Sequence, residues 1–412
     1  MTEQRCSITR LRPHTHKVSP GPPTSDPNRA VPRSTRGSCH PTHPGASVRR
    51  GAGGAASTRR LKGHSEFRAS WRSRVKRIRI GAIGLGMVGS AQVKTIASSV
   101  GAGDLVAVAD ANLERAQVVA ATLPGDVRVF ASAEELIASA DVDAITIASS
   151  AESHLALVLA CIEHRKPVFC EKPLAMTAAD CELILDAEIR AGRRFVQVGF
   201  MRRYDAAFVD LKAAVDTGEL GEIVSLQFVH RAADVPPSVT SSAHTTEAVV
   251  HEVDSTRWLL DDDIVEVRVT GNGGKTGLED WLDPQFFYFR TAAGVMIYSE
   301  VFLKAAYGYE IGCDVIGRSG MARLTNATPV AVSLDFRVSG VREKDFTVRF
   351  GDAYRRELVA WALDAVEGVV TGPNAWDGYC AALVTDACLD SLRSGDSVQV
   401  HSRDRPALYG AD

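Results

Sequence analysis

The stretch IRIGAIGLGMVG, residues 78–89, decides the fold of this chain. Its apolar first half predicts a short β-strand, and the residues that follow it, 90–98, are compatible with a helix. Between them, Gly84, Gly86 and Gly89 have the spacing Gly-x-Gly-x-x-Gly. The first glycine permits a tight turn, the second lets a pyrophosphate approach the backbone, and the third lets the helix pack closely on the strand. The stretch therefore predicts a dinucleotide-binding turn, with the phosphates at the helix N-terminus.

An acidic residue supports this prediction. Asp110 ends the next apolar run, residues 105–109, about 20 positions after Gly89. A carboxylate at the end of the second strand can accept hydrogen bonds from the adenosine ribose hydroxyls. The alternative is that Asp110 only caps the helix that follows it. Asp110 would repel a 2′-phosphate, and Ala111 offers no positive charge, so the sequence favours NAD over NADP.

Length and composition limit the class of protein. The chain has 412 residues, of which 45% are hydrophobic and 24% are charged, and this is ordinary for a water-soluble protein with two domains. No apolar run reaches the roughly 18 residues that a membrane span needs, so no membrane partner is expected. The eight cysteines form no Cys-x-x-Cys pair, and we expect no metal site, free thiols and a cytoplasmic enzyme.

The N-terminal residues differ in charge from the rest of the chain. Residues 1–77 hold 17 Lys or Arg and three acids, whereas the remainder holds 30 basic and 47 acidic residues. The segment 1–74 is rich in Pro, Ser, Gly, His and Arg, which predicts a disordered basic tail without the apolar core of a secretory signal. The stretch is alternatively a mispredicted extension, with translation starting near Val75. A nucleic-acid-binding arm is the remaining interpretation, but nucleic acid is not the expected partner.

Helix and strand patterns alternate through residues 75–198, which we expect to form the first folded domain. Ser132 opens one of the helices with the spacing of a capping box. Such alternation predicts a Rossmann-type, doubly wound parallel sheet, which is an α/β fold. The expected strands after the second one cover residues 127–130, 144–148, 168–170 and 195–198.

Two of these strands end in polar residues that point to a ligand site, because ligands of such sheets bind beyond the carboxyl ends of the strands. Ser149 follows one strand, and Glu171 and Lys172 follow another. Lys172 would place a cationic donor near the nicotinamide and a substrate hydroxyl, and a buried lysine can join proton transfer. The alternative is a surface lysine paired with Glu171.

The remainder, residues 199–412, predicts a second domain of the α+β class. Successive strand-like runs indicate an open, mostly antiparallel sheet with helices on one face, and the other face would be free to pair with a second subunit. The expected strands are 223–231, 264–271, 285–290, 295–302 and 309–316, and the expected helices are 206–216, 353–370 and 376–394.

A further helix is expected over residues 245–260, where Glu247 and His251 are separated by four positions. Side chains at this spacing share one helix face and can touch. A carboxylate beside a histidine raises the histidine pKa and fixes its tautomer, which suits a general base for a hydroxyl proton. From spacing alone, a structural helix pair is the alternative.

Three features together resemble the glucose–fructose oxidoreductase/inositol dehydrogenase family. They are the glycine turn with its strand-end Asp110, Glu-Lys-Pro at 171–173, and VGFMRRY at 198–204. The resemblance runs from about Val75 to the C-terminus, and within the family it is strongest to bacterial inositol 2-dehydrogenases. The stretches that carry this likeness are VPPS (235–238), HEVD (251–254), YGY (307–309), YRREL (354–358) and WDGY (376–379).

The resemblance implies NAD-dependent oxidation of a secondary alcohol on a cyclic polyol, with myo-inositol giving 2-keto-myo-inositol in inositol catabolism. It also implies a homo-oligomer, either a dimer or a tetramer. The implied catalytic residues are Lys172, Glu247 and His251. Arg202 and Asp254 are the candidates for substrate binding, although a structural role for Asp254 is the alternative. The expected cofactor-binding residues are Gly84, Gly86, Met87, Val88, Gly89, Asp110, Ser149, Glu171 and Lys172.

One departure from the family pattern concerns the acid. Inositol dehydrogenases have Asp where this chain has Glu247, and the additional methylene moves the carboxylate. Two other functions stay open at this point. One is a dehydrogenase for another polyol or sugar, such as scyllo-inositol or an aldose. The other is a non-enzymatic regulator that senses NAD, against which the presence of all three catalytic candidates argues.

Overall fold

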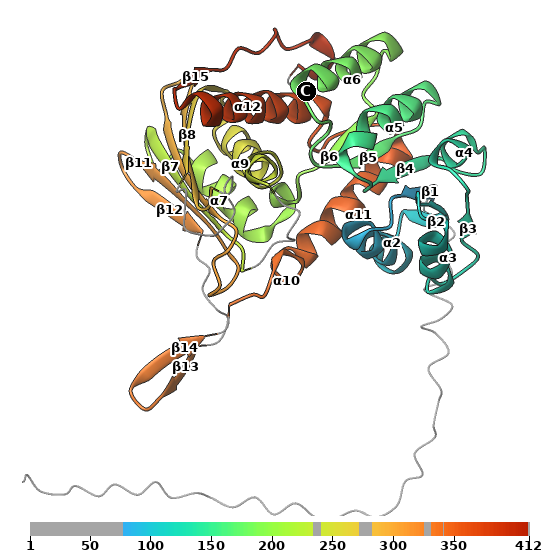
Figure 1. Cartoon of the computed structure of the whole chain (residues 1–412), viewed down its shortest axis with the longest axis horizontal. Coiled ribbons are helices and arrows are strands. Elements are labelled where there is room, and N and C mark those ends of the chain that lie inside the picture. Colours follow the sequence, from blue (N-terminus) through green and yellow to red (C-terminus); the bar gives the residue numbers. More distant parts are fainter. Residues whose placement is uncertain (1–76, 234–239, 272–281, 325–330, 341, 411–412) are drawn as a thin grey trace, which may run out of the picture. The chain divides into compact units, whose positions relative to one another are not determined.

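The computed structural model describes residues 77–233, 240–271, 282–324, 331–340 and 342–410 (Figure 1). The expected tail, residues 1–74, and the motif at 235–238 lie outside the described residues. In the described part of the chain, no helix is both long and apolar enough to cross a membrane.

Sheet A contains six strands, and all its neighbouring pairs are parallel. Their spatial order is β3-β2-β1-β4-β5-β6, the order of a doubly wound Rossmann sheet. The strand order reverses between β1 and β4, and ligands of such sheets bind at this switch point. The predicted α/β fold is therefore confirmed. The strands are β1 (Ile78–Ile83), β2 (Gly103–Ala109), β3 (Arg128–Val129), β4 (Ala144–Ile147), β5 (Val168–Glu171) and β6 (Val196–Gly199).

The helices of this half follow the expected alternation. Ser132 caps its helix as expected, accepting a hydrogen bond from Glu135 N. Two helices begin three residues earlier than predicted, at Met87 and at Ala151. The helices are α2 (Met87–Ser99), α3 (Leu113–Ala121), α4 (Ala133–Ala138), α5 (Ala151–Glu163) and α6 (Ala178–Ala191).

Sheet B has seven strands in the order β12-β11-β7-β10-β9-β8-β15. Only the pair β10 and β7 is parallel, so the prediction of a mostly antiparallel sheet is confirmed. Helices α9 and α12 lie on one side of this sheet (Figure 1). The strands are β7 (Ile223–Arg231), β8 (Ile264–Gly271), β9 (Gln285–Thr291), β10 (Met296–Phe302), β11 (Glu310–Gly317), β12 (Met321–Leu324) and β15 (Val398–Gln399).

The predicted helix over residues 245–260 is divided in the structure. A π-helix, η2 (His244–Ala248), precedes α9 (Val250–Leu260). The other helical segments are η1 (Met201–Tyr204), α7 (Ala206–Asp216), α8 (Ser241–Ala243), α10 (Phe346–Arg349), α11 (Gly351–Glu367), α12 (Ala375–Ser394) and η3 (Ala407–Tyr409).

A hairpin that the sequence did not predict forms from β13 (Ala331–Leu334) and β14 (Arg337–Gly340). Its turn places Asp335 and Phe336 at φ 49° and 61°. Asp is a usual residue at the first left-handed position of such a turn, but Phe336 stands where Gly is usual, so the Asn-Gly or Asp-Gly signal was absent.

The C-terminal part of the chain returns to sheet A. Helix α11 packs against α2 and η1, and its Trp361 is buried with its ring 5.9 Å from that of Phe169 on β5. Residues near the end of the sequence therefore support the strand that carries Glu171.

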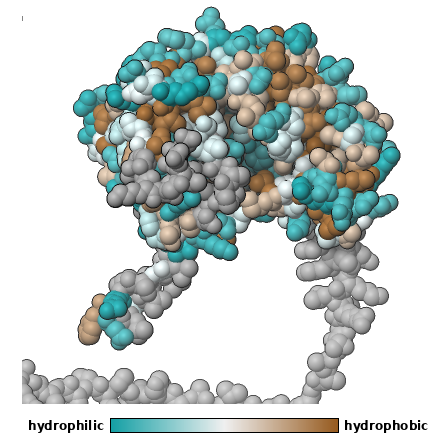
Figure 2. Space-filling view, in the orientation of Figure 1, coloured by the Kyte–Doolittle hydropathy of each residue, from teal (hydrophilic) through white to brown (hydrophobic). Residues whose placement is uncertain are grey.

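On the face shown in Figure 2, apolar and hydrophilic side chains are interspersed, and the surface is hollowed near the centre.

Candidate active site

The three glycines of the first turn have different surroundings. Gly84 has a φ of 83°, and a Cβ built on it would lie 2.4 Å from Ser149 N. A Cβ on Gly89 would lie 1.9 Å from Gly84 O, so the fold excludes a side chain at both positions. A Cβ on Gly86 would meet nothing within 4 Å, and Gly86 caps α2 without a side-chain hydrogen bond. The open space at Gly86 and the N–H groups of the first turn of α2, which begins at Met87 and Val88, fit a pyrophosphate.

Asp110 lies beside this turn at the end of β2. Its Oδ2 accepts a hydrogen bond of 2.7 Å from Leu85 N, and its Oδ1 accepts one of 2.8 Å from Asn112 N. These bonds fix the carboxylate at the position where a Rossmann fold binds the adenosine ribose. The sequence-based reasoning missed Arg115, whose Nη1 lies 3.4 Å from Asp110 Oδ1, because it considered only the next residue, Ala111.

Lys172 connects the two halves of the molecule. Its Nζ donates a hydrogen bond of 3.1 Å to the backbone oxygen of Glu247 in η2. The preceding side chain, Glu171, is buried and accepts a 2.6 Å hydrogen bond from Gln92 Nε2 on α2. Burial raises the pKa of Glu171 to about 7, although the charge of Lys172 lowers it. Lys172 Nζ and the Glu171 carboxyl thus form hydrogen bonds with different residues, Glu247 and Gln92.

His154 on α5 links two strand ends that border the expected nicotinamide site. Its Nδ1 lies 2.8 Å from Pro173 O, and its Nε2 lies 3.2 Å from Ser149 O. Ser149 in turn shares a 2.6 Å hydrogen bond with Ser153. The buried imidazole therefore holds the segment after Lys172 against the end of β4. Sequence spacing did not reveal this contact, because it depends on the packing of α5 against the strand ends.

His251 and Glu247 do not interact through their side chains in this structure. Among the described residues, the exposed Glu247 carboxylate has no hydrogen bond or ion pair, and the buried His251 Nδ1 has no partner. The i, i+4 argument assumed a continuous α-helix, whereas Glu247 lies in the π-helix, whose wider turn shifts that register.

The pKa of His251 is also shifted in the direction opposite to the prediction. Burial lowers it well below the ordinary value of 6.5, and the positive charges of Lys172, Arg202 and His230 lower it further. The Lys172 ammonium, which also contacts η2, is therefore close enough to His251 for its charge to lower the pKa of the imidazole. His251 is consequently a neutral imidazole at physiological pH, which is the form that can accept a proton.

Arg202 forms a buried ion pair that spacing did not predict. Its Nη2 lies 2.6 Å from Glu252 Oε1, and His230 Nδ1 lies 3.1 Å from the same oxygen. Burial alone would raise the pKa of Glu252, but Arg202 and His230 lower it to about 2. Within the described residues, Arg202 Nε and Nη1 are buried without a partner. These two donors keep Arg202 a candidate for binding substrate hydroxyls.

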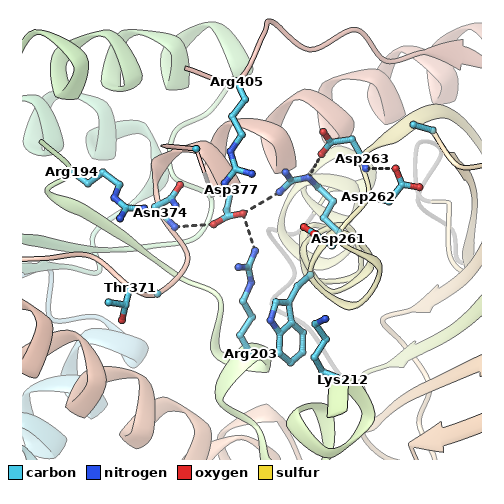
Figure 3. Close-up of a pocket in the computed structure, with 15 residues that line it drawn as sticks. Arg194, Arg203, Lys212, Asp261, Asp262, Asp263, Thr371, Asn374, Asp377 and Arg405 are labelled. Atoms are coloured by element: carbon cyan, nitrogen blue, oxygen red, sulfur yellow. Dashed lines mark hydrogen bonds and ion pairs between the residues drawn. The ribbon is translucent and has the colours of Figure 1, made fainter. Parts of the chain in front are cut away.

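Asp254 belongs to a different cluster. Its carboxylate accepts hydrogen bonds from Arg203 Nε and Nη2, and Asp377 lies 3.1 Å from Arg203 and 3.2 Å from Arg257. Arg203 and Asp377 line a polar cavity of about 480 Å³ (Figure 3). The lining of this cavity contains none of the three catalytic candidates. The ion pair with Arg203 accounts for the burial of Asp254 without a role in substrate binding.

Two family models match the chain. One is described as an oxidoreductase family with an NAD-binding Rossmann fold and matches residues 78–200. The other is the GFO/IDH/MocA C-terminal domain and matches residues 208–323. The chain belongs to the GFO/IDH/MocA oxidoreductase family. The predicted family, the dehydrogenase class and the NAD cofactor are thereby confirmed.

Individual relatives agree with this assignment. Inositol 2-dehydrogenase 1 of Saccharopolyspora erythraea is 42% identical over 334 residues, which cover 81% of this chain and 99% of the relative. Inositol 2-dehydrogenase of Serratia proteamaculans is 40% identical over 333 residues, with the same coverage. The crystal structure of myo-inositol dehydrogenase from Lactobacillus casei, in complex with NAD(H) and myo-inositol, matches with a TM-score of 0.78 and 29% identity. It covers 81% of this chain and 99% of that protein.

Proposed function

We propose that the protein is an NAD-dependent inositol dehydrogenase that oxidises myo-inositol to 2-keto-myo-inositol. The observation that carries the proposal is the position of Lys172. It leaves the carboxyl end of β5 in the NAD-binding sheet and reaches η2, one turn before His251. The inositol dehydrogenase relatives, which match along 81% of the chain, support inositol as the substrate class.

The residues present fit the chemistry of alcohol oxidation. When bound, NAD⁺ supplies the acceptor for the hydride that leaves the carbinol carbon. The neutral His251 imidazole accepts the hydroxyl proton, so that the proton and the hydride depart to different acceptors. The Lys172 ammonium donates a hydrogen bond to the reacting oxygen and stabilises the negative charge that develops there. Arg202 offers its two unpartnered donors to neighbouring hydroxyls.

Glu247 has two separable roles in this proposal. Its backbone oxygen orients Lys172. The family resemblance also gives its carboxylate the role of orienting His251, a contact that the two side chains do not make in this structure. Glu247→Ala keeps the backbone oxygen and removes the carboxylate. A loss of turnover in this variant supports the carboxylate role, whereas unchanged turnover leaves only the backbone contact.

Steady-state kinetics test the proposal directly. The rate of NAD reduction is measured with myo-inositol, scyllo-inositol and a panel of aldoses, each with NAD and with NADP. The proposal expects the highest kcat/KM for myo-inositol with NAD. No reduction with any polyol would contradict it, and a clear preference for scyllo-inositol or an aldose would reassign the substrate.

We also propose that the protein is a cytoplasmic homo-oligomer that serves inositol catabolism. The side of sheet B opposite α9 and α12 exposes apolar side chains, including Tyr288, Met296 and Met321. A second subunit would bury this face, as larger exposed apolar patches commonly indicate interaction sites. The free cysteines of the described residues are all buried, which suits a reducing compartment. Light scattering after size exclusion tests the assembly, and a monomer would contradict it.

A further inference from the structure

Arg115 is a charged side chain that the proposed reaction does not use. It lies in the first turn of α3, and its side chain is 50% exposed. Its Nη1 lies 3.4 Å from Asp110 Oδ1 and 3.5 Å from Asp110 Oδ2. In the part of the chain that the structure describes, this carboxylate is the only partner of the guanidinium. Arg115 thus lies next to the position where the adenosine ribose binds in a Rossmann fold.

The contact with Arg115 is not needed to hold Asp110 in place. Asp110 already accepts hydrogen bonds from Leu85 N and Asn112 N, both shorter than its contacts with Arg115. An ion pair with a half-exposed arginine contributes about 0–1 kcal/mol to stability. The fold therefore gives little reason for an arginine at this position, and a function toward the coenzyme accounts for it better.

Rossmann folds distinguish the two coenzymes by charge at this place. An acid accepts hydrogen bonds from the ribose 2′-hydroxyl of NAD, whereas a nearby arginine accommodates the 2′-phosphate of NADP. The planar guanidinium is suited to phosphate because it can donate two parallel hydrogen bonds. This chain holds both groups in contact, so the acid neutralises the arginine and also repels the phosphate.

We propose that Arg115 is a specificity-determining residue that forms a latent 2′-phosphate site, which Asp110 blocks. Asp110 and Arg115 together set the preference for NAD, and loss of the Asp110 charge releases Arg115 for NADP. The inference rests on the proposed use of NAD at the Gly84–Gly89 turn. It does not depend on which polyol is oxidised.

The test measures coenzyme binding in the full chain without any polyol, by fluorescence titration with NADH and NADPH. The variants are Asp110→Asn, Arg115→Ala and the double variant. Asn keeps the shape and removes the charge, and its one oxygen can accept from only one of the two backbone N–H groups that Asp110 binds. As a control for the loss of one acidic charge, Asp390→Asn disrupts an exposed Asp–Arg pair on α12, in which Arg393 Nη2 lies 2.9 Å from Asp390 Oδ1.

The expected result is a reversal of preference that depends on Arg115. Asp110→Asn should bind NADPH about tenfold or more tightly than the wild type and NADH about tenfold more weakly, the size expected for charge-assisted hydrogen bonds. The double variant should lose the gain in NADPH affinity, and Asp390→Asn should behave as the wild type. The NADPH affinity of Asp110→Asn should also fall steeply with salt.

Two outcomes would overturn the inference. One is a folded Asp110→Asn protein, checked by circular dichroism, that binds NADPH no better than the wild type. The other is a double variant that keeps the full gain in NADPH affinity. If Asp110→Asn fails to fold, Asp110→Ser is compared with and without Arg115→Ala in the same way, and an equal NADPH affinity of the two variants would overturn the inference. Normal NADH binding without polyol turnover would contradict the proposed function and leave this test unaffected.

Discussion

Glu357 offers a prediction whose magnitude follows from its surroundings. This side chain on α11 is 1% exposed, and within the described residues neither of its carboxyl oxygens has a hydrogen-bond partner. Burial raises its pKa well above the ordinary value of 4.5, and the negative charges of Glu171 and Asp254 raise it further. A buried carboxylate without a cation is costly, so the folded protein keeps the proton that the unfolded chain loses.

The sign and size of the effect follow from this proton. Above pH 4.5 the folded state binds one proton more than the unfolded state, so the free energy of unfolding falls as pH rises. The slope is about 1.4 kcal/mol per pH unit for as long as folded Glu357 stays protonated. Glu357→Gln removes this proton and the slope with it. Measured between about pH 6 and about pH 8, the variant should gain stability relative to the wild type by up to about 1.4 kcal/mol per pH unit, for as long as folded Glu357 keeps its proton.

The assay is urea denaturation of the coenzyme-free protein, followed by tryptophan fluorescence across this pH range. Glu188→Gln is the matched control, because Glu188 is equally buried but accepts hydrogen bonds from Phe195 N, Val196 N and the Tyr409 hydroxyl. Its amide would face these donors and should cost about 1–3 kcal/mol for each one left unpaired. The reasoning fails if Glu357→Gln destabilises the protein as Glu188→Gln does, or if its effect does not change with pH.

Three further predictions concern the site and its support. Gly86→Ala should leave the urea midpoint unchanged and weaken NADH binding about tenfold or more. Gly89→Ala should weaken NADH binding and also destabilise the fold by about 1–3 kcal/mol, because its Cβ would lie 1.9 Å from a backbone oxygen. Equal urea midpoints for the two variants would contradict this prediction. Arg203→Met should cost about 3–5 kcal/mol by leaving Asp254 buried without its partner, and a change below about 1 kcal/mol in urea denaturation would argue against that role. Because the pKa of His251 is lowered, kcat/KM should decline with falling pH only below pH 6.5, and a decline that begins above that value would exclude His251 as the base.

Local patterns predicted most of the fold. The run at residues 78–89 fixed the first strand, the turn and the start of α2, because glycine spacing and apolar alternation act within one short segment. The division into η2 and α9 was not predicted, since a π-helical turn has no sequence period that a helix pattern reveals. The hairpin β13–β14 was missed because Phe336 follows Asp335 at the second left-handed position, where Gly is usual.

Family motifs singled out Lys172 and His251, and the contact of Lys172 with η2 agrees with a shared site, while the catalytic roles of both residues stay predictions. Residues that act through tertiary contacts were not predictable from the sequence. Arg115 reaches Asp110 from the next helix, and His154 bridges two strand ends. Glu357 enters the surroundings of Glu171 from a helix that lies nearly 200 positions later in the chain. No spacing rule identifies such pairs, because their proximity depends on how distant elements pack.

The most direct test of the account is the turnover of His251→Ala with myo-inositol and NAD, measured together with its NADH affinity. If the buried neutral imidazole takes the hydroxyl proton beside Lys172, kcat should fall by about 10² or more while NADH binds as in the wild type. A variant that turns over at the wild-type rate would show that another group accepts the proton, and the assignment of this site would be wrong.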